Sequence, residues 1–156
     1  MKPAHPHLMN ATDALRREPL WSHPWNPQSS VASVYLGRSL GLQRCGVNIA
    51  RVPPGKESFL PHRHEREEEW LYVLSGRGVV EIDGEDLPVS AGDFVAFPAP
   101  SVVHHLRNPS DEDLVYLMGG QHLEHEIEDF PTVGKRLIRS GEQQFVYDMA
   151  AARPLE

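Results

Sequence analysis

Two histidines separated by one residue stand in the most informative stretch of the chain. His62 and His64 fall in a segment that predicts a strand, and side chains two residues apart on a strand project from the same face. Neutral imidazole nitrogens are common ligands of divalent transition metals. The pair therefore predicts half of a metal site. Taken alone, such a pair is more often hydrogen-bonded or exposed on the surface, so further ligands are needed.

A carboxylate follows the pair at a suitable distance. Residues 65–68 predict a polar turn, and a new strand begins at Glu69. If Leu71 and Val73 face the interior, Glu69 shares their face and is aimed at the two histidines. In the competing register Glu68 would lie inside instead. We favour Glu69, because it puts the aliphatic residues of this strand in the core.

A second pair of histidines offers one more ligand. His104 and His105 are adjacent on a predicted strand over residues 103–107, so they face opposite ways and only one of them is an easy ligand. Three neutral imidazoles and one carboxylate suit one divalent transition metal (Fe, Mn, Ni, Zn or Cu) and suit Ca²⁺ or Mg²⁺ poorly. Because the ligands must be deprotonated, we expect metal affinity to fall as the pH drops through about 6.5.

Short strands predict the framework that positions these side chains. Runs rich in Val, Ile, Tyr, Phe and Leu alternate with turn residues, and Asp83-Gly84 is a strong signal for a two-residue hairpin. This spacing, with almost no helical periodicity, predicts an all-β sandwich or barrel. The expected strands are 31–36, 45–52, 57–62, 69–74, 77–82, 86–89, 94–97, 103–107 and 113–118.

The two ends of the chain differ from this central part. Residues 1–30 predict an irregular arm with a short helix over 11–18, and Trp21 and Trp25 are expected to pin the arm onto the body or onto a second subunit. The barrel is expected over residues 31–118. Residues 119–156 predict a C-terminal extension that packs on the barrel or across a dimer. His122 and His125, beside the acidic stretch at 124–129, are expected to lie on a solvated surface, and a strand is expected near 144–147.

Composition excludes several classes of function. The chain has 156 residues, enough for one domain, and a formal net charge of -7. That charge and the lack of a basic patch argue against nucleic acid as a partner. No run approaches the roughly 18 apolar residues of a membrane span, and the first residues lack the apolar stretch of a secretory signal, so no such signal is expected. The single cysteine, Cys45, is expected to be a buried thiol in a reducing cytoplasm.

The order of glycine, histidine and glutamate matches a known motif. Gly55 precedes His62 and His64, Glu69 follows after four residues, and Gly76 follows after six more. This order resembles the first motif of the cupin superfamily, in particular of its small single-domain (conserved-barrel) members. That motif reads Gly, five residues, His-x-His, three or four residues, Glu, six residues, Gly. The chain departs from it in having six residues between Gly55 and His62.

The second cupin motif is also present, with changes in one turn. It reads Gly, five residues, Pro-x-Gly, two residues, His, three residues, Asn, and Gly92, Pro98, His104 and Asn108 match it. Pro100 stands where the family has glycine, and three residues rather than two precede His104. These changes leave His105 open as the ligand. The spacing to Asn108 and the parity with Leu106 favour His104.

The resemblance implies both a fold and a ligand set. The implied fold is all-β, a double-stranded β-helix or jelly-roll barrel, usually dimeric, here with an irregular N-terminal arm and a short C-terminal extension. The implied metal ligands are His62, His64, Glu69 and His104. The implied partners are a small molecule and a second copy of the chain in a homodimer. Neither nucleic acid nor a membrane is implied as a partner.

The function implied is that of a mononuclear metal-binding cupin. We expect a metal-dependent enzyme that acts on a small organic molecule. Dioxygenase-type chemistry is the first expectation. The alternatives are a non-redox isomerase, lyase or decarboxylase, and a non-catalytic module that binds a small ligand. Leu71, Val73, Leu106 and either Phe94 or Phe97 are expected to line the interior. Acid or base candidates, each more often structural or exposed, are His105, Tyr72, Tyr116 and Arg51.

Overall fold

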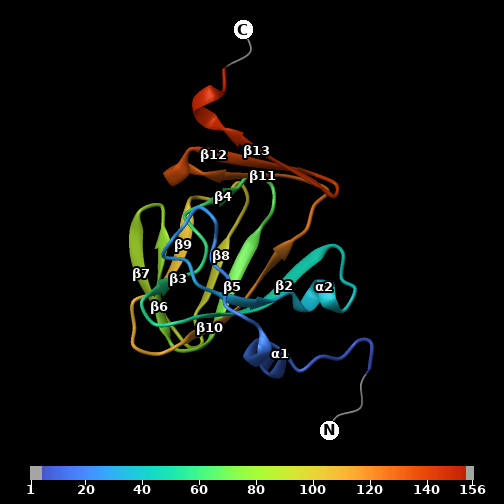
Figure 1. Cartoon of the computed structure of the whole chain (residues 1–156), viewed down its shortest axis with the longest axis vertical. Helices are drawn as coiled ribbons and strands as arrows, with labels where there is room; N and C mark the ends of the chain where they lie inside the picture. The colour runs from blue at the N-terminus through green and yellow to red at the C-terminus, as the bar shows by residue number, and fades with distance from the viewer. Residues whose placement is uncertain (1–4, 154–156) are drawn as a thin grey trace.

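Antiparallel strands make up most of the chain, and the computed structural model describes residues 5–153 (Figure 1). One sheet has five strands, in the order β1 (Ala32–Val34), β2 (Cys45–Val52), β10 (Leu114–Gln121), β5 (Glu69–Ser75) and β8 (Phe94–Phe97). A second has four, in the order β3 (Lys56–Glu57), β9 (His104–Asn108), β6 (Arg77–Ile82) and β7 (Glu85–Ser90). The non-sequential order of neighbours is that of a jelly roll, so the expected all-β barrel is confirmed.

The hydrophobic core lies between these two sheets. Alternate residues of each strand point inward, so each sheet contributes one apolar face. Val73 on β5 and Leu114 on β10 are fully buried, and Val80 on β6 is almost so. The other buried apolar residues of this core are Val31, Ala50, Val52, Leu71, Val89, Phe97, Leu106 and Tyr116.

Two turns explain why particular residues occupy them. Asp83 and Gly84 join β6 to β7 with φ of 51° and 84°, which is the conformation of the predicted two-residue hairpin. Gly76, the last residue of the first motif, has φ of +83°, and a Cβ atom there would collide with the carbonyl of Asp113. A glycine is therefore required where β5 passes β10 and enters β6.

A third sheet lies across one end of the barrel (Figure 1). Its strands run in the order β13 (Gln143–Asp148), β12 (Lys135–Ser140), β11 (His125–Phe130) and β4 (Arg63–His64). Two 3₁₀ turns, η1 (Pro131–Val133) and η2 (Met149–Ala151), belong to the same extension. Because β4 carries His64, the C-terminal extension is paired directly with the segment that holds the candidate ligands.

The N-terminal arm packs on its own chain. The short helix expected over 11–18 is present as α1 (Ala11–Arg17), where Leu15 is buried in a small cluster with Ala32 and Val34. Trp21 exchanges two backbone hydrogen bonds with Val31, of 2.8 and 2.9 Å. The ring of Trp25 meets that of Phe130 on β11 edge to face, with centroids 5.4 Å apart.

Several expected strands have different limits. The strand expected over 57–62 ends at Glu57, and His62 makes only an isolated bridge with His104. The strand expected over 31–36 ends at Val34, since α2 (Leu36–Ser39) follows. His122 and His125 are exposed, as expected, but the acidic stretch beside them contributes β11 (His125–Phe130), in which Glu126 is buried. The acidic residues of β11 have low β-propensity, and the pairing of this strand with β4 and β12 overrides that preference.

Two further observations concern the surface. Cys45 is exposed, so the expectation of a buried thiol is wrong; the residue opens β2 at the end of the five-stranded sheet, where it faces away from the core. No helix among residues 5–153 is long and apolar enough to cross a membrane.

Candidate metal centre

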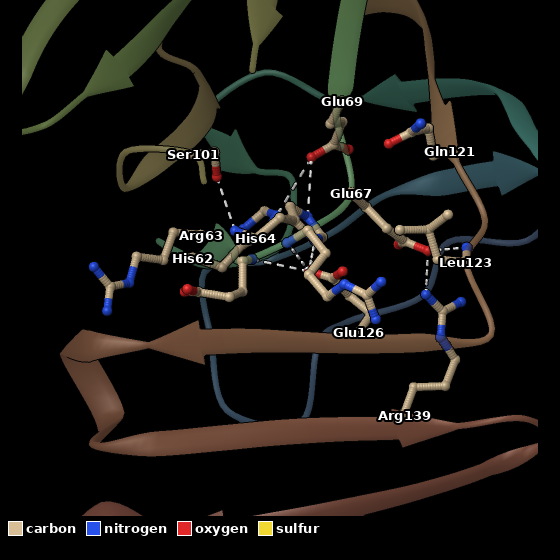
Figure 2. Close-up of polar contacts among 12 residues, drawn as sticks. His62, Arg63, His64, Glu67, Glu69, Ser101, Gln121, Leu123, Glu126 and Arg139 are labelled. Carbon is tan, nitrogen blue, oxygen red and sulfur yellow. Dashed lines mark hydrogen bonds and ion pairs between the residues drawn. The ribbon is translucent and has the colours of Figure 1, made fainter. Parts of the chain in front are cut away.

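Four side chains from three segments converge at the mouth of the barrel. His62, His64, Glu69 and His104 each offer one ligand atom, and these atoms all lie within 4.8 Å of one another. Oε2 of Glu69 is the common centre, 3.1 Å from Nε2 of His104, 3.3 Å from Nε2 of His64 and 3.7 Å from Nε2 of His62. Figure 2 shows Glu69 at the start of its strand, directed toward the histidine pair.

The backbone fixes His62 and His104 side by side. His62 N–H donates to the His104 carbonyl at 3.1 Å, and His104 N–H donates back to the His62 carbonyl at 2.9 Å. Nδ1 of His62 lies 2.8 Å from the Leu60 carbonyl, and Nδ1 of His104 lies 3.0 Å from the Val102 carbonyl. A carbonyl can only accept, so each Nδ1 carries the proton. Nε2 is then the atom left to contact Glu69, and once deprotonated it can bind a metal ion.

His64 is held by the turn that departs from the cupin motif. Its backbone N–H donates to Oγ of Ser101 at 2.8 Å, and Ser101 N–H donates to the His64 carbonyl, also at 2.8 Å. Ser101 is one of the three residues that precede His104, where the family has two. The irregular turn therefore ties the His64 segment to the strand that carries His104.

The strand register answers which glutamate faces inward. Leu71 and Val73 are buried, Glu69 shares their face, and Glu68 is exposed. The alternative register with Glu68 inside is therefore excluded. Glu69 pairs with Phe97 on β8, which closes the wall of the barrel beside the site.

The structure also separates the two adjacent histidines. His104 points inward, and its ring stacks on Phe97 with centroids 3.8 Å apart and planes at 11°. His105 points to the opposite face of the sheet, where its Nε2 is 3.6 Å from a carboxylate oxygen of Glu57. Burial lowers the pKa of His105 to about 4, which the charge of Glu57 only partly opposes. His105 is therefore a buried neutral histidine outside the cluster.

The surroundings shift the pKa values of several residues in the cluster. Burial opposes ionisation of Glu69, but hydrogen bonds from the three histidines outweigh it and hold the pKa of this carboxyl well below its usual value. Burial alone would lower the pKa of His64, but the hydrogen bond and charge of Glu69 raise it to about 9. Burial lowers the pKa of His104 despite the same carboxylate. At neutral pH the Glu69 carboxylate is thus paired with a protonated His64, and a metal ion would take the place of that proton.

The donor set fits a transition metal. Ligand bonds of about 2.1 Å at right angles place neighbouring donor atoms about 3 Å apart, and the Glu69 distances of 3.1 to 3.7 Å are close to that value. Three imidazole nitrogens and one carboxylate oxygen suit the first-row divalent ions. The cluster could therefore hold one such ion with little rearrangement.

A small cavity adjoins the cluster inside the barrel. Its volume is about 30 Å³, room for about two waters. The walls are mostly apolar, and Phe97 rather than Phe94 faces inward, since Phe94 is 61% exposed. Of the acid and base candidates, Tyr116 and His105 line the cavity. The aliphatic and thioether side chains of the lining are Leu71, Val80, Leu106 and Met118.

Three buried charged residues near the site escaped the sequence analysis. Glu126 lies beneath His64, and Glu67 pairs with Arg139 next to it (Figure 2). Glu126 and Arg139 come from the C-terminal extension. The signal available was weak: Glu126, Glu128 and Phe130 alternate with period two, which is typical of one strand face.

Metal affinity is expected to fall as the pH is lowered from 9. The pKa of His64 is raised to about 9 in the metal-free protein, so a metal must displace this proton at any lower pH. The apparent affinity should drop about tenfold per pH unit between pH 9 and 7, a window above the ordinary histidine value near 6.5. Titration of Zn²⁺ against a chelator at pH 7, 8 and 9 measures this. Equal affinities at the three pH values would contradict it.

Comparison with known proteins agrees with the fold. A model of the cupin domain matches residues 48–120. A solved structure from Acidithiobacillus ferrooxidans, described as a candidate sugar phosphate isomerase, is 36% identical, covers 96% of each chain and superposes with a TM-score of 0.86. A sugar phosphate isomerase of the cupin superfamily from Silicibacter pomeroyi is 26% identical over 93% of this chain and 94% of its own, with a TM-score of 0.80. The chain belongs to the cupin superfamily.

A curated relative matches over a shorter stretch. The oxalate-binding protein of Thermotoga maritima is 40% identical over 67 residues, which is 43% of this chain and 54% of that protein. The chain thus spans about half the length of the curated relatives it matches.

Proposed function

We propose that this cupin is a metal-dependent enzyme acting on a small organic molecule that chelates the metal. The observation that carries this proposal is the chemistry of the cavity. No lysine or arginine is present in its lining within residues 5–153. The ion bound by His62, His64, Glu69 and His104 would thus be the sole cation available to an anionic substrate.

A bound divalent ion would supply a positive centre with two free coordination positions and, with iron or another redox-active metal, electrons for oxygen chemistry. The chain's own residues would do the rest. Phe97, Leu106 and Met118 exclude water from the cavity, which strengthens electrostatic interactions within it. The small volume favours a substrate of few heavy atoms.

Tyr116 is one proton donor in the lining of the cavity. Its side chain is 2% exposed. Burial and the negative charge of Glu69 raise the pKa of its phenol. The hydroxyl therefore stays protonated at neutral pH and can donate a hydrogen bond to an oxygen of the substrate.

Replacing Tyr116 with phenylalanine is expected to lower kcat/KM about 10- to 100-fold, because a hydrogen bond to a charged group contributes about 1.5–3 kcal/mol. Metal content should stay that of the wild type, since the phenol is not a ligand. Tyr72→Phe, which removes an exposed hydroxyl from the same sheet, is the matched control. Equal kcat/KM values for the two variants would contradict the role of Tyr116 as a hydrogen-bond donor to the substrate.

We place dioxygenase-type chemistry first. The test is oxygen consumption by the iron-loaded protein with small catechols, diketones and hydroxy acids. Uptake of O₂ coupled to loss of one of these compounds supports the proposal. Turnover that proceeds equally well without oxygen, or with Zn²⁺ in place of iron, would select a non-redox isomerase, lyase or decarboxylase instead.

A second candidate is binding of a small dicarboxylate without oxygen chemistry. The likeness to the oxalate-binding protein and the small, cation-free cavity both favour it. Calorimetric titration of the Mn²⁺-loaded protein with oxalate distinguishes it: tight binding with no product by mass spectrometry would support a non-catalytic module.

We also propose that the chain forms a homodimer, through β13. All six residues of this strand are exposed, and its outer edge pairs with no strand among residues 5–153. Phe145, Val146 and Tyr147 are 45%, 49% and 49% exposed. Such an edge is a template for a second strand, and an antiparallel copy across a two-fold axis satisfies both edges at once.

Light scattering is expected to give twice the chain mass at micromolar concentration. Val146→Lys on the proposed edge should give a monomer with unchanged metal content. A wild-type monomer, or a Val146→Lys dimer as tight as the wild type, would contradict this assembly.

A further inference from the structure

His64 differs from its two neighbours in the partner of its second nitrogen. Nδ1 of His62 and of His104 each lies against a backbone carbonyl. Nδ1 of His64 is buried and has no hydrogen-bond partner among the described residues. The nearest acceptor is the carboxylate of Glu126, whose Oε1 is 3.7 Å away.

One of the two carboxylate oxygens of Glu126 has hydrogen-bond partners and the other has none among the described residues. Its side chain is 0% exposed. Oε1 accepts the backbone N–H groups of Glu65 at 2.9 Å and Arg66 at 3.1 Å, while Oε2 is buried with no partner. Burying a carboxylate is costly unless its oxygens are hydrogen-bonded. A buried nitrogen of His64 without a partner therefore lies beside a carboxylate that still has an unused oxygen.

The strand pairing brings these residues together. Glu128 on β11 pairs with His64 on β4, and Glu126 lies two residues earlier on the same face of β11. Figure 2 shows Glu126 between the histidine pair and the strands of the C-terminal extension. The cupin domain model ends at residue 120, so this carboxylate comes from outside the part of the chain that it matches.

We infer that Glu126 is a positioning residue for the metal centre, one that accepts a hydrogen bond from Nδ1–H of His64. With the proton kept on Nδ1, the lone pair of Nε2 is directed toward Glu69 and the metal position. Carboxylate–histidine contacts of this kind fix the tautomer and raise the basicity of a metal ligand. The inference rests on the proposed metal centre. It assigns to the C-terminal extension a part in building that centre.

Replacing Glu126 with glutamine separates this role from a purely structural one. The amide oxygen can still accept both backbone N–H groups, which keeps the turn at residues 65–66 in place. The amide nitrogen then occupies the position of Oε2, so the negative charge and the unused acceptor are both lost. The proton of His64 is held less firmly on Nδ1, and the tautomer protonated on Nε2 cannot bind the metal through that atom.

The experiment is a competition titration of Zn²⁺ with a chromophoric chelator. Glu126→Gln is expected to bind Zn²⁺ about 10- to 100-fold more weakly than the wild type. Glu128→Gln is the matched control, because Glu128 also acts on His64 through its charge but makes no contact with Nδ1. Equal losses in both variants would show that charge alone is responsible and would overturn the inference.

A measurement on the wild type covers the case in which Glu126→Gln fails to fold. ¹H–¹⁵N spectra of the imidazole nitrogens in the Zn²⁺-loaded protein should show a protonated Nδ1 on His64, with its proton shifted downfield by a carboxylate. An unprotonated Nδ1 would overturn the inference. If the wild type binds no Zn²⁺ at all, the metal centre itself fails. If it binds Zn²⁺ and Glu126→Gln binds equally well, only the role of Glu126 fails.

Discussion

Replacing Glu69 with glutamine is expected to lower metal affinity by about 100- to 1000-fold. Protein metal sites bind with about 10–16 kcal/mol spread over about four ligands, so one ligand carries several kcal/mol. Glu69 also supplies the negative charge of the cluster, and all three Nε2 atoms lie within 3.7 Å of its Oε2. Its amide analogue keeps the shape but loses that charge. Equilibrium dialysis with Zn²⁺ or Mn²⁺ measures the change.

The neighbouring residue provides the control. Glu68→Gln removes the same charge one residue away, on an exposed side chain that faces outward. Its affinity should match the wild type within about threefold. If Glu68→Gln were the variant that lost metal, the strand register described for β5 would be wrong. Equal retention of metal by both variants would place the ion elsewhere.

Replacing Arg139 with methionine is expected to destabilise the metal-free protein by about 3–5 kcal/mol, the usual cost of leaving a buried charge without its partner. Arg139 donates to Glu67, and the two residues are 7% and 8% exposed. The same Glu67 oxygen accepts the backbone N–H of Leu123 at 2.5 Å. The pair thus ties the turn between the two site segments to the extension. Urea unfolding measures the loss.

Two further variants test the cause of that loss. Glu67→Gln combined with Arg139→Met removes both charges, and we expect it to recover a large part of the lost stability. Arg136→Met, in the more exposed ion pair with Asp129, should cost about 1 kcal/mol or less. Similar losses for Arg139→Met and Arg136→Met would contradict the importance assigned to burial.

The ligand cluster could be predicted from the sequence because local sequence patterns determine where most of its residues lie. Period-two alternation puts His62 and His64 on one face, and the run of aliphatic residues after Glu69 determines which glutamate faces inward. Hairpin chemistry at Asp83-Gly84 also depends only on neighbouring residues, and there the structure agrees. The choice between His104 and His105 needed more. Spacing favoured His104, and the stacking on Phe97 in the structure shows why it faces inward.

The structure of the C-terminal extension was harder to predict from the sequence, for a physical reason. Strands β11 and β12 are rich in charged residues, which usually indicate solvent. Glu126 and Arg139 are buried because distant partners satisfy them: two backbone N–H groups of the turn at 65–66 for the first, and Glu67 for the second. Such pairings depend on residues about 60 to 70 positions away, and no local pattern encodes them.

Anomalous diffraction from crystals grown with Zn²⁺, collected on both sides of the zinc absorption edge, tests the metal assignment most directly. A single strong peak is predicted among the Nε2 atoms of His62, His64 and His104 and Oε2 of Glu69, with a much weaker peak in Glu69→Gln. A fully loaded protein whose peak lies away from these four side chains, or crystals with no peak at all, would contradict the assignment.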